Sequence, residues 1–256
     1  MLKKRIIFVL FYQNGSFHLS RNFGLQKVGD TQWLLEKFQF LKIGDYIDEL
    51  IILDVSRDRI NEPVSSQLEE DVKNLMAKIF VPLTLGGGIR TLDHVSRCFQ
   101  AGADKVSLNW ALGNSPDLIS EISKRYGSQS VVASMDVRYV SGKYDVFCDY
   151  GQTRIGSLLD VSKQSEDLGA GELFITSIDR DGTGFGLDLN IFKELEDVRV
   201  PIIASGGAGK PLHFFEALSL KSISGVATGN LFNFMGSGFF ELRSELGKKL
   251  PYLRKL

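Results

Sequence analysis

The sequence predicts a (β/α)₈ barrel, an α/β fold in which eight parallel strands alternate with helices. The chain has 256 residues, and this fold takes roughly 250. Eight short apolar runs alternate with longer amphipathic segments, which is typical of a parallel sheet covered by helices. A Gly-rich motif also occurs twice, about half a chain apart, and indicates two half-barrels. We therefore expect one domain over residues 1–256 with a two-fold repeat.

The expected strands are the runs rich in β-branched and aliphatic residues. They cover residues 5–11, 49–54, 80–85, 105–108, 130–136, 172–178, 201–204 and 225–228. Between the first two strands, the spacing of Trp33, Leu34, Phe38 and Leu41 predicts a helix. Residues 236–256 are charged and amphipathic, and we expect a helix there that closes the barrel, with a partner contact as the alternative.

A doubly wound open sheet is the main alternative fold. It is disfavoured because no Gly-x-Gly-x-x-Gly motif opens the first helix. In addition, no Pro- or Ser-rich linker and no shift in composition divides the chain.

The composition argues against several classes of function. Thirty Lys and Arg against 31 Asp and Glu leave a net charge of -1, so no general positive field attracts nucleic acid or an anionic membrane. No stretch approaches the roughly 20 apolar residues of a membrane span. Cys98 and Cys148 lie 50 residues apart, and His18, His94 and His213 have no ligand spacing. We expect a cytoplasmic protein without a disulfide, a metal or another cofactor.

The repeated motif places two glycine-rich turns after hydrophobic strands. Residues 81–89 and 200–208 share one outline. Such turns can present backbone N–H groups to a phosphate, although they can also be tight turns without a ligand. Two related turns favour a ligand with two phosphates. With neighbouring polar residues, the expected binding set is Gly87, Gly88, Asn109, Asp181, Gly182, Gly206, Gly207, Gly229 and Asn230.

Carboxylates at strand ends are candidates for acid–base chemistry, because the active sites of such barrels lie at the C-terminal ends of the strands. Asp54, Asp136, Asp179 and Asp181 have this position. We expect Asp136 to be catalytic, against the alternative of a structural loop carboxylate. We expect Asp181 to orient a substrate and Asp179 to pair with a basic residue.

Charged residues also stand at the beginnings of four strands, at the opposite mouth of the barrel. Arg5, Glu49, Lys105 and Glu172 fall on the first, second, fourth and sixth strands, so two cations and two anions could form a ring of ion pairs. From spacing alone, neutralisation of charge at an exposed mouth is the simpler explanation, with a modest value for stability.

Seven motifs stand out along the chain: KRII at 4–7, DEL at 48–50, GGGI at 86–89, ADKVS at 103–107, GSQSVV at 127–132, IDRDGT at 178–183 and SGGAGK at 205–210. With these motifs in this order, the chain resembles the HisF family, the cyclase subunits of imidazole glycerol phosphate synthase. The resemblance covers almost the whole chain, as far as about Phe234.

The resemblance implies a role for each end of the barrel. In this family a glutaminase subunit docks beneath the barrel and releases ammonia, which passes through the centre to a bisphosphorylated substrate at the other mouth. The four strand-initial charges match the charged gate at the ammonia entrance, and Asp104 matches a residue that faces the glutaminase. The glycine-rich turns match the two phosphate sites, and Asp136 matches one of two catalytic aspartates.

One part of the family pattern is missing. The other catalytic aspartate would end the first strand, where this chain has Phe11, and residues 1–29 contain no Asp or Glu that a shifted alignment could supply. A family lysine of the first loop is replaced by Leu19. Phe11 cannot transfer a proton, and losing an acid–base partner commonly costs a factor of ~10² to 10⁴ in rate.

These departures make the chain similar to HisF-like paralogues of the WbuZ type, which lack the same aspartate. That resemblance implies conversion of an acetamido to an acetamidino group on a sugar for surface polysaccharides, with a HisH-like glutaminase and a separate sugar amidotransferase. This is our leading hypothesis. The alternatives are the imidazole glycerol phosphate synthase cyclase of histidine biosynthesis and a non-catalytic ammonia conduit or scaffold.

Overall fold

Eight parallel strands form a closed barrel in the computed structural model, which describes residues 3–38, 40–56, 64–230 and 237–255. Each strand pairs with the next, and the last pairs with the first, with Arg5 opposite Gly225. The predicted α/β barrel is therefore confirmed. In order around the barrel the strands are β1 (Arg5–Gln13), β4 (Glu49–Asp54), β5 (Leu83–Gly86), β6 (Lys105–Leu108), β7 (Val131–Val140), β10 (Glu172–Ser177), β11 (Ile202–Ser205) and β12 (Ile223–Thr228).

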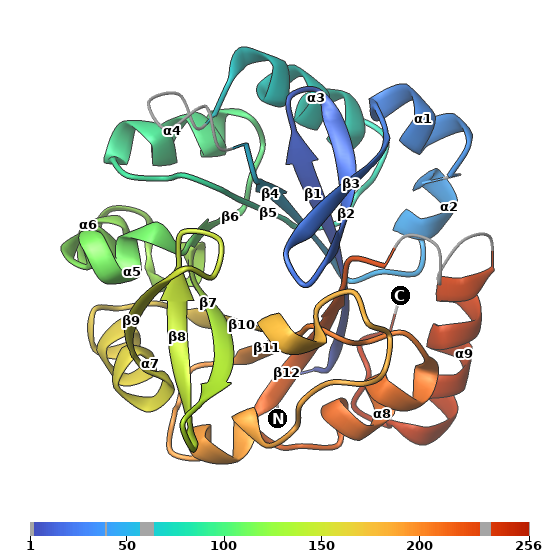
Figure 1. Ribbon diagram of the computed structural model, residues 1–256. Helices are drawn as coiled ribbons and strands as arrows, with labels where there is room; N and C mark the ends of the chain where they lie inside the picture. The colour runs from blue at the N-terminus through green and yellow to red at the C-terminus, as the bar shows by residue number, and fades with distance from the viewer. Residues whose placement is uncertain (1–2, 39, 57–63, 231–236, 256) are drawn as a thin grey trace.

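Helices surround the strands (Figure 1). Ser65 and Thr91 accept hydrogen bonds from backbone N–H groups three residues later, which is how N-cap residues start a helix. Between β10 and β11 the chain forms two 3₁₀ helices in place of an α-helix. The elements are α1 (Thr31–Glu36), α2 (Phe40–Gly44), α3 (Ser66–Met76), α4 (Leu92–Gln100), α5 (Trp110–Asn114), α6 (Asp117–Tyr126), η1 (Ser128–Ser130), α7 (Leu158–Asp167), η2 (Ile178–Arg180), η3 (Ile191–Leu195), α8 (Pro211–Leu218) and α9 (Gly238–Lys249).

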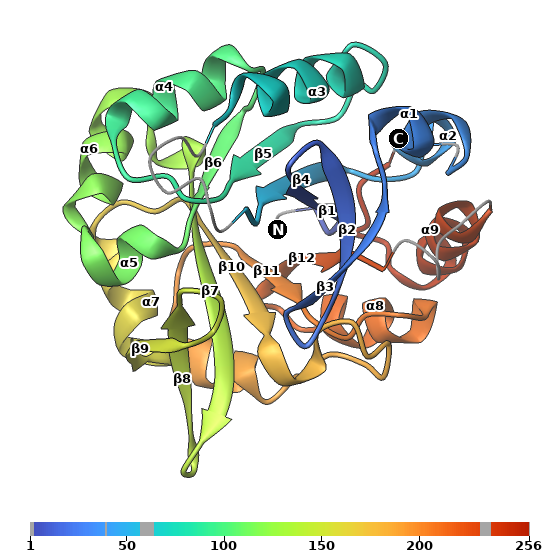
Figure 2. The same ribbon diagram turned by 45° about the horizontal axis from the view of Figure 1, so that its top comes forward.

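The first strand of each half-barrel, β1 or β7, continues into an antiparallel hairpin. β2 (Ser16–Arg21) pairs with β1 and with β3 (Gly24–Gly29). β8 (Lys143–Cys148) pairs with β7 and with β9 (Thr153–Ser157). Figure 2 shows both hairpins extending from the barrel. The two-fold repeat therefore includes these additions.

Two hydrophobic cores hold the barrel together. The larger lies between strands and helices and includes Phe8, whose ring contacts those of Phe38, Phe40 and Phe239 at centroid distances of 6.2, 5.8 and 5.1 Å. The smaller fills the barrel interior, where Phe11 and Leu53 pack against Ile7, Val9, Ile51, Val132, Phe174, Ile203 and Ala227. Because side chains alternate along a strand, one set of β1 residues faces the helices and the other faces the interior.

Two element predictions were wrong in detail. The third strand begins at Leu83 instead of residue 80, and Phe80 is 94% exposed. Pro82 has no N–H to donate, so regular pairing begins after it. The helix predicted over Trp33 to Leu41 is two short helices, because the amides of Lys37 and Phe38 both donate to the Trp33 carbonyl and end α1. Leu41 is exposed.

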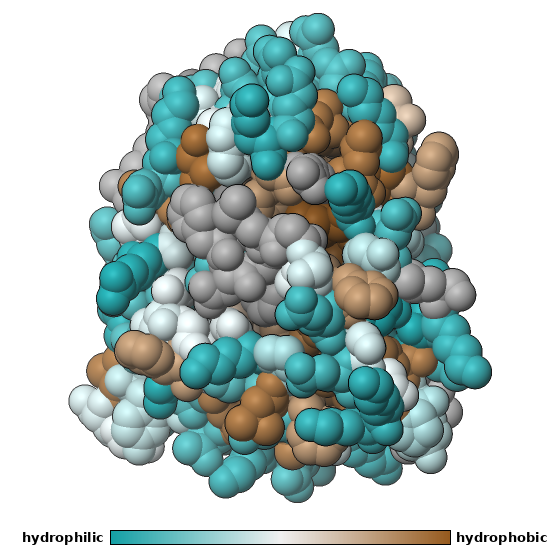
Figure 3. Space-filling view, turned by 90° about the vertical axis from the view of Figure 1, so that its right-hand side faces the viewer, coloured by the Kyte–Doolittle hydropathy of each residue, from teal (hydrophilic) through white to brown (hydrophobic). Residues whose placement is uncertain are grey.

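The expected closing helix is confirmed over Gly238–Lys249, where Phe239, Leu242 and Leu246 are buried. Residues 236 and 256 of the predicted segment lie outside the described residues. Beyond α9 the chain pairs beside the start of β1, with Lys4 opposite Leu253. Figure 3 shows mostly hydrophilic side chains on the side of the molecule that carries α9, with hydrophobic ones scattered among them. In the described part of the chain, no helix has the length and apolar character that crossing a membrane requires.

Replacing Phe8 by Ala is expected to lower the free energy of unfolding by about 3 to 5 kcal/mol, because a cavity remains where three rings met. Urea denaturation followed by circular dichroism measures this change. Leu212→Ala, at a position that is 55% exposed, is the control and should change stability by less than about 0.5 kcal/mol. Equal effects of the two substitutions would contradict the central place of Phe8 in the core.

Candidate active site

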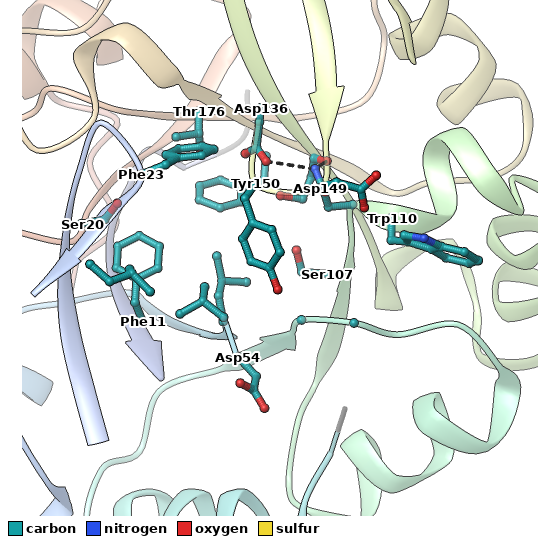
Figure 4. A pocket seen from close by; sticks show the side chains of 18 of the residues that line it. Phe11, Ser20, Phe23, Asp54, Ser107, Trp110, Asp136, Asp149, Tyr150 and Thr176 are labelled. Carbon is teal, nitrogen blue, oxygen red and sulfur yellow. Dashed lines mark hydrogen bonds between the residues drawn. The ribbon is translucent and has the colours of Figure 1, made fainter. Parts of the chain in front are cut away.

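Two adjoining pockets lie at the C-terminal ends of the barrel strands. The carboxylate pocket, seen in Figure 4, contains Asp54, Asp136, Asp149, Gly87, Gly88 and Asn109 among its lining residues. The glycine pocket contains Asp181, Gly182, Gly206, Gly207, Gly229 and Asn230. Phe11 and Ser20 line both pockets. The expected binding residues therefore gather at one mouth, divided into two groups by half-barrel.

Phe11 occupies the position that corresponds to Asp136 in the other half-barrel. On β1, Phe11 lies opposite Leu53, four residues after Glu49. On β7, Asp136 lies opposite Thr176, four residues after Glu172. The Phe11 ring stands where the two pockets meet, and a Cβ on Gly229 would come within 2.8 Å of it. A phenyl ring thus separates the pockets at one of the two equivalent strand ends.

Asp136 has the environment of a group that exchanges protons near neutral pH. Asn109 Nδ2 donates to its Oδ2 at 3.2 Å and to the Ser134 carbonyl at 3.1 Å. Burial raises the pKa of Asp136 to about 7, the negative charge of Asp181 adds to the rise, and the Asn109 hydrogen bond opposes it. Such a carboxyl group can serve as acid or base at physiological pH.

Asp181 holds the β2–β3 hairpin over the mouth. Its Oδ2 accepts hydrogen bonds from Ser20 Oγ at 2.5 Å and from the Phe23 amide at 3.1 Å. A Cβ on Gly182 would lie 2.2 Å from the Ser20 carbonyl oxygen, so only glycine permits this approach. Burial raises the pKa of Asp181. The sequence predicted substrate orientation for Asp181 and did not reveal this anchoring contact.

The other strand-end carboxylates have different surroundings. Asp179 forms the predicted pair with a basic residue, because Arg138 Nε lies 3.5 Å from its Oδ1. Asp54 is buried, and its Oδ1 accepts from the Ser56 amide at 2.9 Å. Leu19, at the place of the family lysine, pairs with Gln26 in the hairpin.

The two glycine-rich turns have the same construction. Gly87 and Gly206 have φ of +111° and +90°, and an added Cβ would lie 2.1 Å from the Asp54 carbonyl oxygen or 2.6 Å from that of Ser177. Each turn therefore needs glycine to pack against the preceding barrel strand, whether or not it binds a ligand.

A histidine supports each turn from the helix that follows. His94 Nδ1 accepts from the Arg90 amide at 3.3 Å, and His213 Nδ1 accepts from the Gly209 amide at 3.2 Å. Burial lowers the pKa of both imidazoles, which favours the neutral form that can accept. Sequence analysis found only that these histidines lack the spacing of metal ligands. Their equal spacing from the two turns was the signal that it missed.

The four strand-initial charges form a closed ring at the opposite mouth. Arg5 contacts Glu49 at 2.7 Å and also contacts Glu172, while Lys105 contacts the same two carboxylates at 2.5 and 2.9 Å. Their side chains are 5 to 18% exposed. Burial disfavours charged Arg5, but Glu172 and Glu49 outweigh burial and raise its pKa. The predicted ring of ion pairs is thus present, and it is too buried for a rim that only neutralises charge.

Asp104 lies beside this ring with its side chain largely exposed. Its Oδ2 accepts from the Leu83 amide at 2.8 Å and so caps the start of β5. Asp48, at the corresponding place before β4, is buried and accepts from the Ile6 amide at 2.7 Å. Asp104 therefore has a structural contact and also an exposed face.

Comparisons with known proteins identify the family. The model of the histidine biosynthesis protein family matches residues 31–237. The imidazole glycerol phosphate synthase subunits HisF of Chloroherpeton thalassium and Saccharolobus solfataricus are each 38% identical to this chain, over 97% of its length and 98% of theirs. The chain belongs to the HisF family. A Parasynechococcus marenigrum protein that carries the name imidazole glycerol phosphate synthase subunit hisF2 is 43% identical over 93% of this chain and 88% of its own.

Family membership extends further than the motifs indicated. The alignment with the Chloroherpeton HisF subunit covers 251 residues, so it includes part of the segment after Phe234 that the sequence analysis left unmatched.

Both cysteines are free and buried. Within the described residues, no group of three or more His, Cys, Asp or Glu side chains has an arrangement that could hold a metal ion.

The raised pKa of Asp136 predicts a pH dependence of stability. Between the ordinary pKa near 3.8 and the folded value of about 7, the folded protein binds more protons than the unfolded chain, so its stability falls as pH rises through this window. Asp136→Asn removes this loss. Relative to that variant, the wild type should lose on the order of 2 kcal/mol between about pH 4.5 and 7.5, since water screens part of the effect. Urea denaturation at several pH values measures it, and a pH-independent difference would contradict it.

Proposed function

We propose that the chain is the ammonia-using synthase subunit of a glutamine amidotransferase of the imidazole glycerol phosphate synthase type, and that a HisH-like glutaminase is its partner. One observation carries this proposal: a buried ring of four charges lies at one end of the barrel axis, and a pocket lined by Asp136, whose pKa is raised to about 7, lies at the other. In this proposal the ring is the ammonia gate, and Asp104 belongs to the glutaminase interface.

The barrel interior suits neutral ammonia. Between the ring and the pockets it is filled by apolar side chains such as Ile7, Val9 and Val132. An ammonium ion would lose its hydration there at a high cost, whereas a neutral molecule would not. The ring would admit ammonia by a small displacement of Lys105, because Arg5 by itself contacts both glutamates.

At the other mouth the glycine-rich turns would bind phosphate groups. Gly87, Gly88, Gly206 and Gly207 have backbone that permits close approach of an anion. Asp136 would move the proton during attack of ammonia on the bound substrate. A cytoplasmic location fits the two free thiols.

The relatives favour one reaction. Their names describe subunits of imidazole glycerol phosphate synthase, and the matching family model is that of a histidine biosynthesis protein, so they support the cyclase reaction of histidine biosynthesis more than sugar amidation. This reverses the ranking from motifs alone. A specific observation supports the second candidate: Phe11 stands where the half-barrel symmetry would give a second carboxylate. That second candidate is conversion of an acetamido to an acetamidino group on a sugar, with a sugar amidotransferase as a further partner.

The first experiment supplies the bisphosphorylated cyclase substrate with an excess of ammonium salt, which makes the glutaminase unnecessary. Turnover is expected in the wild type and should fall by about 10² or more in Asp136→Asn, since a general acid–base group is lost. Phe11→Asp should raise turnover because it adds a second proton-transferring group. Phe11→Asn is the matched control, as it is polar but cannot exchange a proton in this range.

The outcomes separate the two candidates. No turnover by folded wild type, with turnover by Phe11→Asp, would reject the histidine reaction and support sugar amidation. No turnover and no substrate binding by either protein would contradict the proposed bisphosphorylated ligand.

The gate is tested with the glutaminase present. In Lys105→Ala, glutamine hydrolysis should exceed product formation, whereas wild type should keep the two rates equal. Reaction with free ammonium should be unchanged, since that ammonia enters from solvent. Lys221→Ala, an exposed lysine at the same end of the barrel, is the control. Equal coupling in Lys105→Ala and wild type would remove the gate assignment.

A further inference from the structure

Arg90 is the one guanidinium among the described residues that line the carboxylate pocket. It stands two residues after Gly88, immediately before the N-cap of α4. Its guanidinium carbon lies 4.4 Å from the centroid of the Trp110 ring, which also lines the pocket. Stacking on an aromatic face is a favourable arrangement for the planar arginine head group, and it restricts the orientation of the donors.

The guanidinium of Arg90 has no hydrogen-bond or ion-pair partner among the described residues, and its Nε is buried. A buried donor without a partner is costly, and native structures satisfy nearly all of them. Six other arginines of the described chain have carboxylate partners: Arg5, Arg97, Arg138, Arg154, Arg199 and Arg243. The remaining described arginines, Arg21, Arg125, Arg180 and Arg254, are exposed to water.

The fold of the turn does not require this side chain. In the other half-barrel the corresponding residue is Gly209, and its backbone amide donates to His213 as that of Arg90 donates to His94. The two turns therefore share their backbone support, while at this equivalent position only the first carries a cationic side chain. Lys210, the next residue of the second turn, is exposed and is not among the lining residues of the glycine pocket. Arg90 distinguishes the two pockets chemically.

A second polar group in the same pocket also lacks a partner. Ser107 is 3% exposed and lines the pocket, and its Oγ has no hydrogen bond within the described residues. Figure 4 shows this hydroxyl on the pocket side of its strand. A bound ligand is the simplest source of partners for both groups.

We propose that Arg90, oriented by Trp110, is the anchor for an oxyanion group of the ligand in the carboxylate pocket, a phosphate monoester or a carboxylate. Asp54, Asp136 and Asp149 line this pocket, and like charge repels an anion. Arg90 supplies the opposing charge at the Gly87-Gly88 turn, a type of turn that can also present backbone N–H groups to an anion. The inference rests on the proposed function only for the presence of an anionic ligand.

The test measures binding of inorganic phosphate and of acetate, followed by the fluorescence of Trp110 in a Trp33→Phe background that leaves it as the sole tryptophan. Phosphate should quench or enhance this fluorescence with saturation. Arg90→Met should weaken phosphate binding by roughly tenfold to a hundredfold, because a charge-assisted hydrogen bond is lost. Arg90→Lys should restore only part of the affinity, since it keeps the charge but not the fork or the stacking.

Arg138→Met is the matched control. Arg138 also stacks on an aromatic ring, with its guanidinium carbon 5.3 Å from the centroid of Phe147, but it already pairs with Asp179. It should leave phosphate binding unchanged. A preference for phosphate over acetate would identify the oxyanion as a phosphate, and the opposite preference would identify it as a carboxylate.

Three binding results would overturn the anchor: equal phosphate binding by Arg90→Met and wild type, equal loss in Arg138→Met, or the same fluorescence change with chloride. A turnover assay separates failure of the anchor from failure of the proposed function. Normal cyclisation with unchanged KM in Arg90→Met would also reject the anchor and leave the proposed function in place. Loss of phosphate binding in that variant, with a wild type that does not turn over the cyclase substrate, would keep the anchor and count against the cyclase reaction.

Discussion

The closed parallel barrel imposes one constraint on which the rest of the structure depends: along each strand, every second side chain faces the same interior. On β1 this places Arg5, Ile7, Val9 and Phe11 in a line from one mouth to the other. On β6, Lys105 lies in the ring and Ser107 lines the carboxylate pocket, as does Asn109 just beyond the end of the strand. Alternation in a few strands therefore produces a charged end, an apolar interior and a polar mouth.

The ring of four charges at this end of the barrel is energetically unfavourable compared with apolar packing. Removing four charges from water is costly, and buried ion pairs commonly stabilise a protein no more than hydrophobic residues of the same size would. The ring returns part of this cost because every charge has two opposite neighbours. A purely structural need would be met by more of the aliphatic packing that lies directly above it. The arrangement is therefore better explained by a role that needs a displaceable polar closure.

Sequence patterns could predict those features that depend on position along a strand. Arg5, Glu49, Lys105 and Glu172 were found because strand-initial residues of a parallel barrel share one mouth, and the glycine-rich turns were found because they repeat. The anchoring role of Asp181 could not be predicted in this way. It depends on contact with Ser20, 161 residues away in the sequence, and thus on how a hairpin folds back over the mouth. The split of the segment after β3 also depends on packing, here of Phe38 and Phe40 against Phe8.

Residues that differ between the two half-barrels indicate where the reaction takes place better than residues that the halves share. The turns at Gly87 and Gly206, and the histidines beneath them, are nearly the same in both halves, so they can account for a shared task such as holding similar groups. Two pairs of equivalent positions differ in charge and bear on the carboxylate pocket: Phe11 corresponds to Asp136, and Arg90 corresponds to Gly209. As a result, the carboxylate pocket contains both Asp136 and Arg90, whereas the phenyl ring of Phe11 lines the glycine pocket. A ligand that spans the two would therefore have its reactive part near Asp136 and a less reactive, anchored part beyond Phe11.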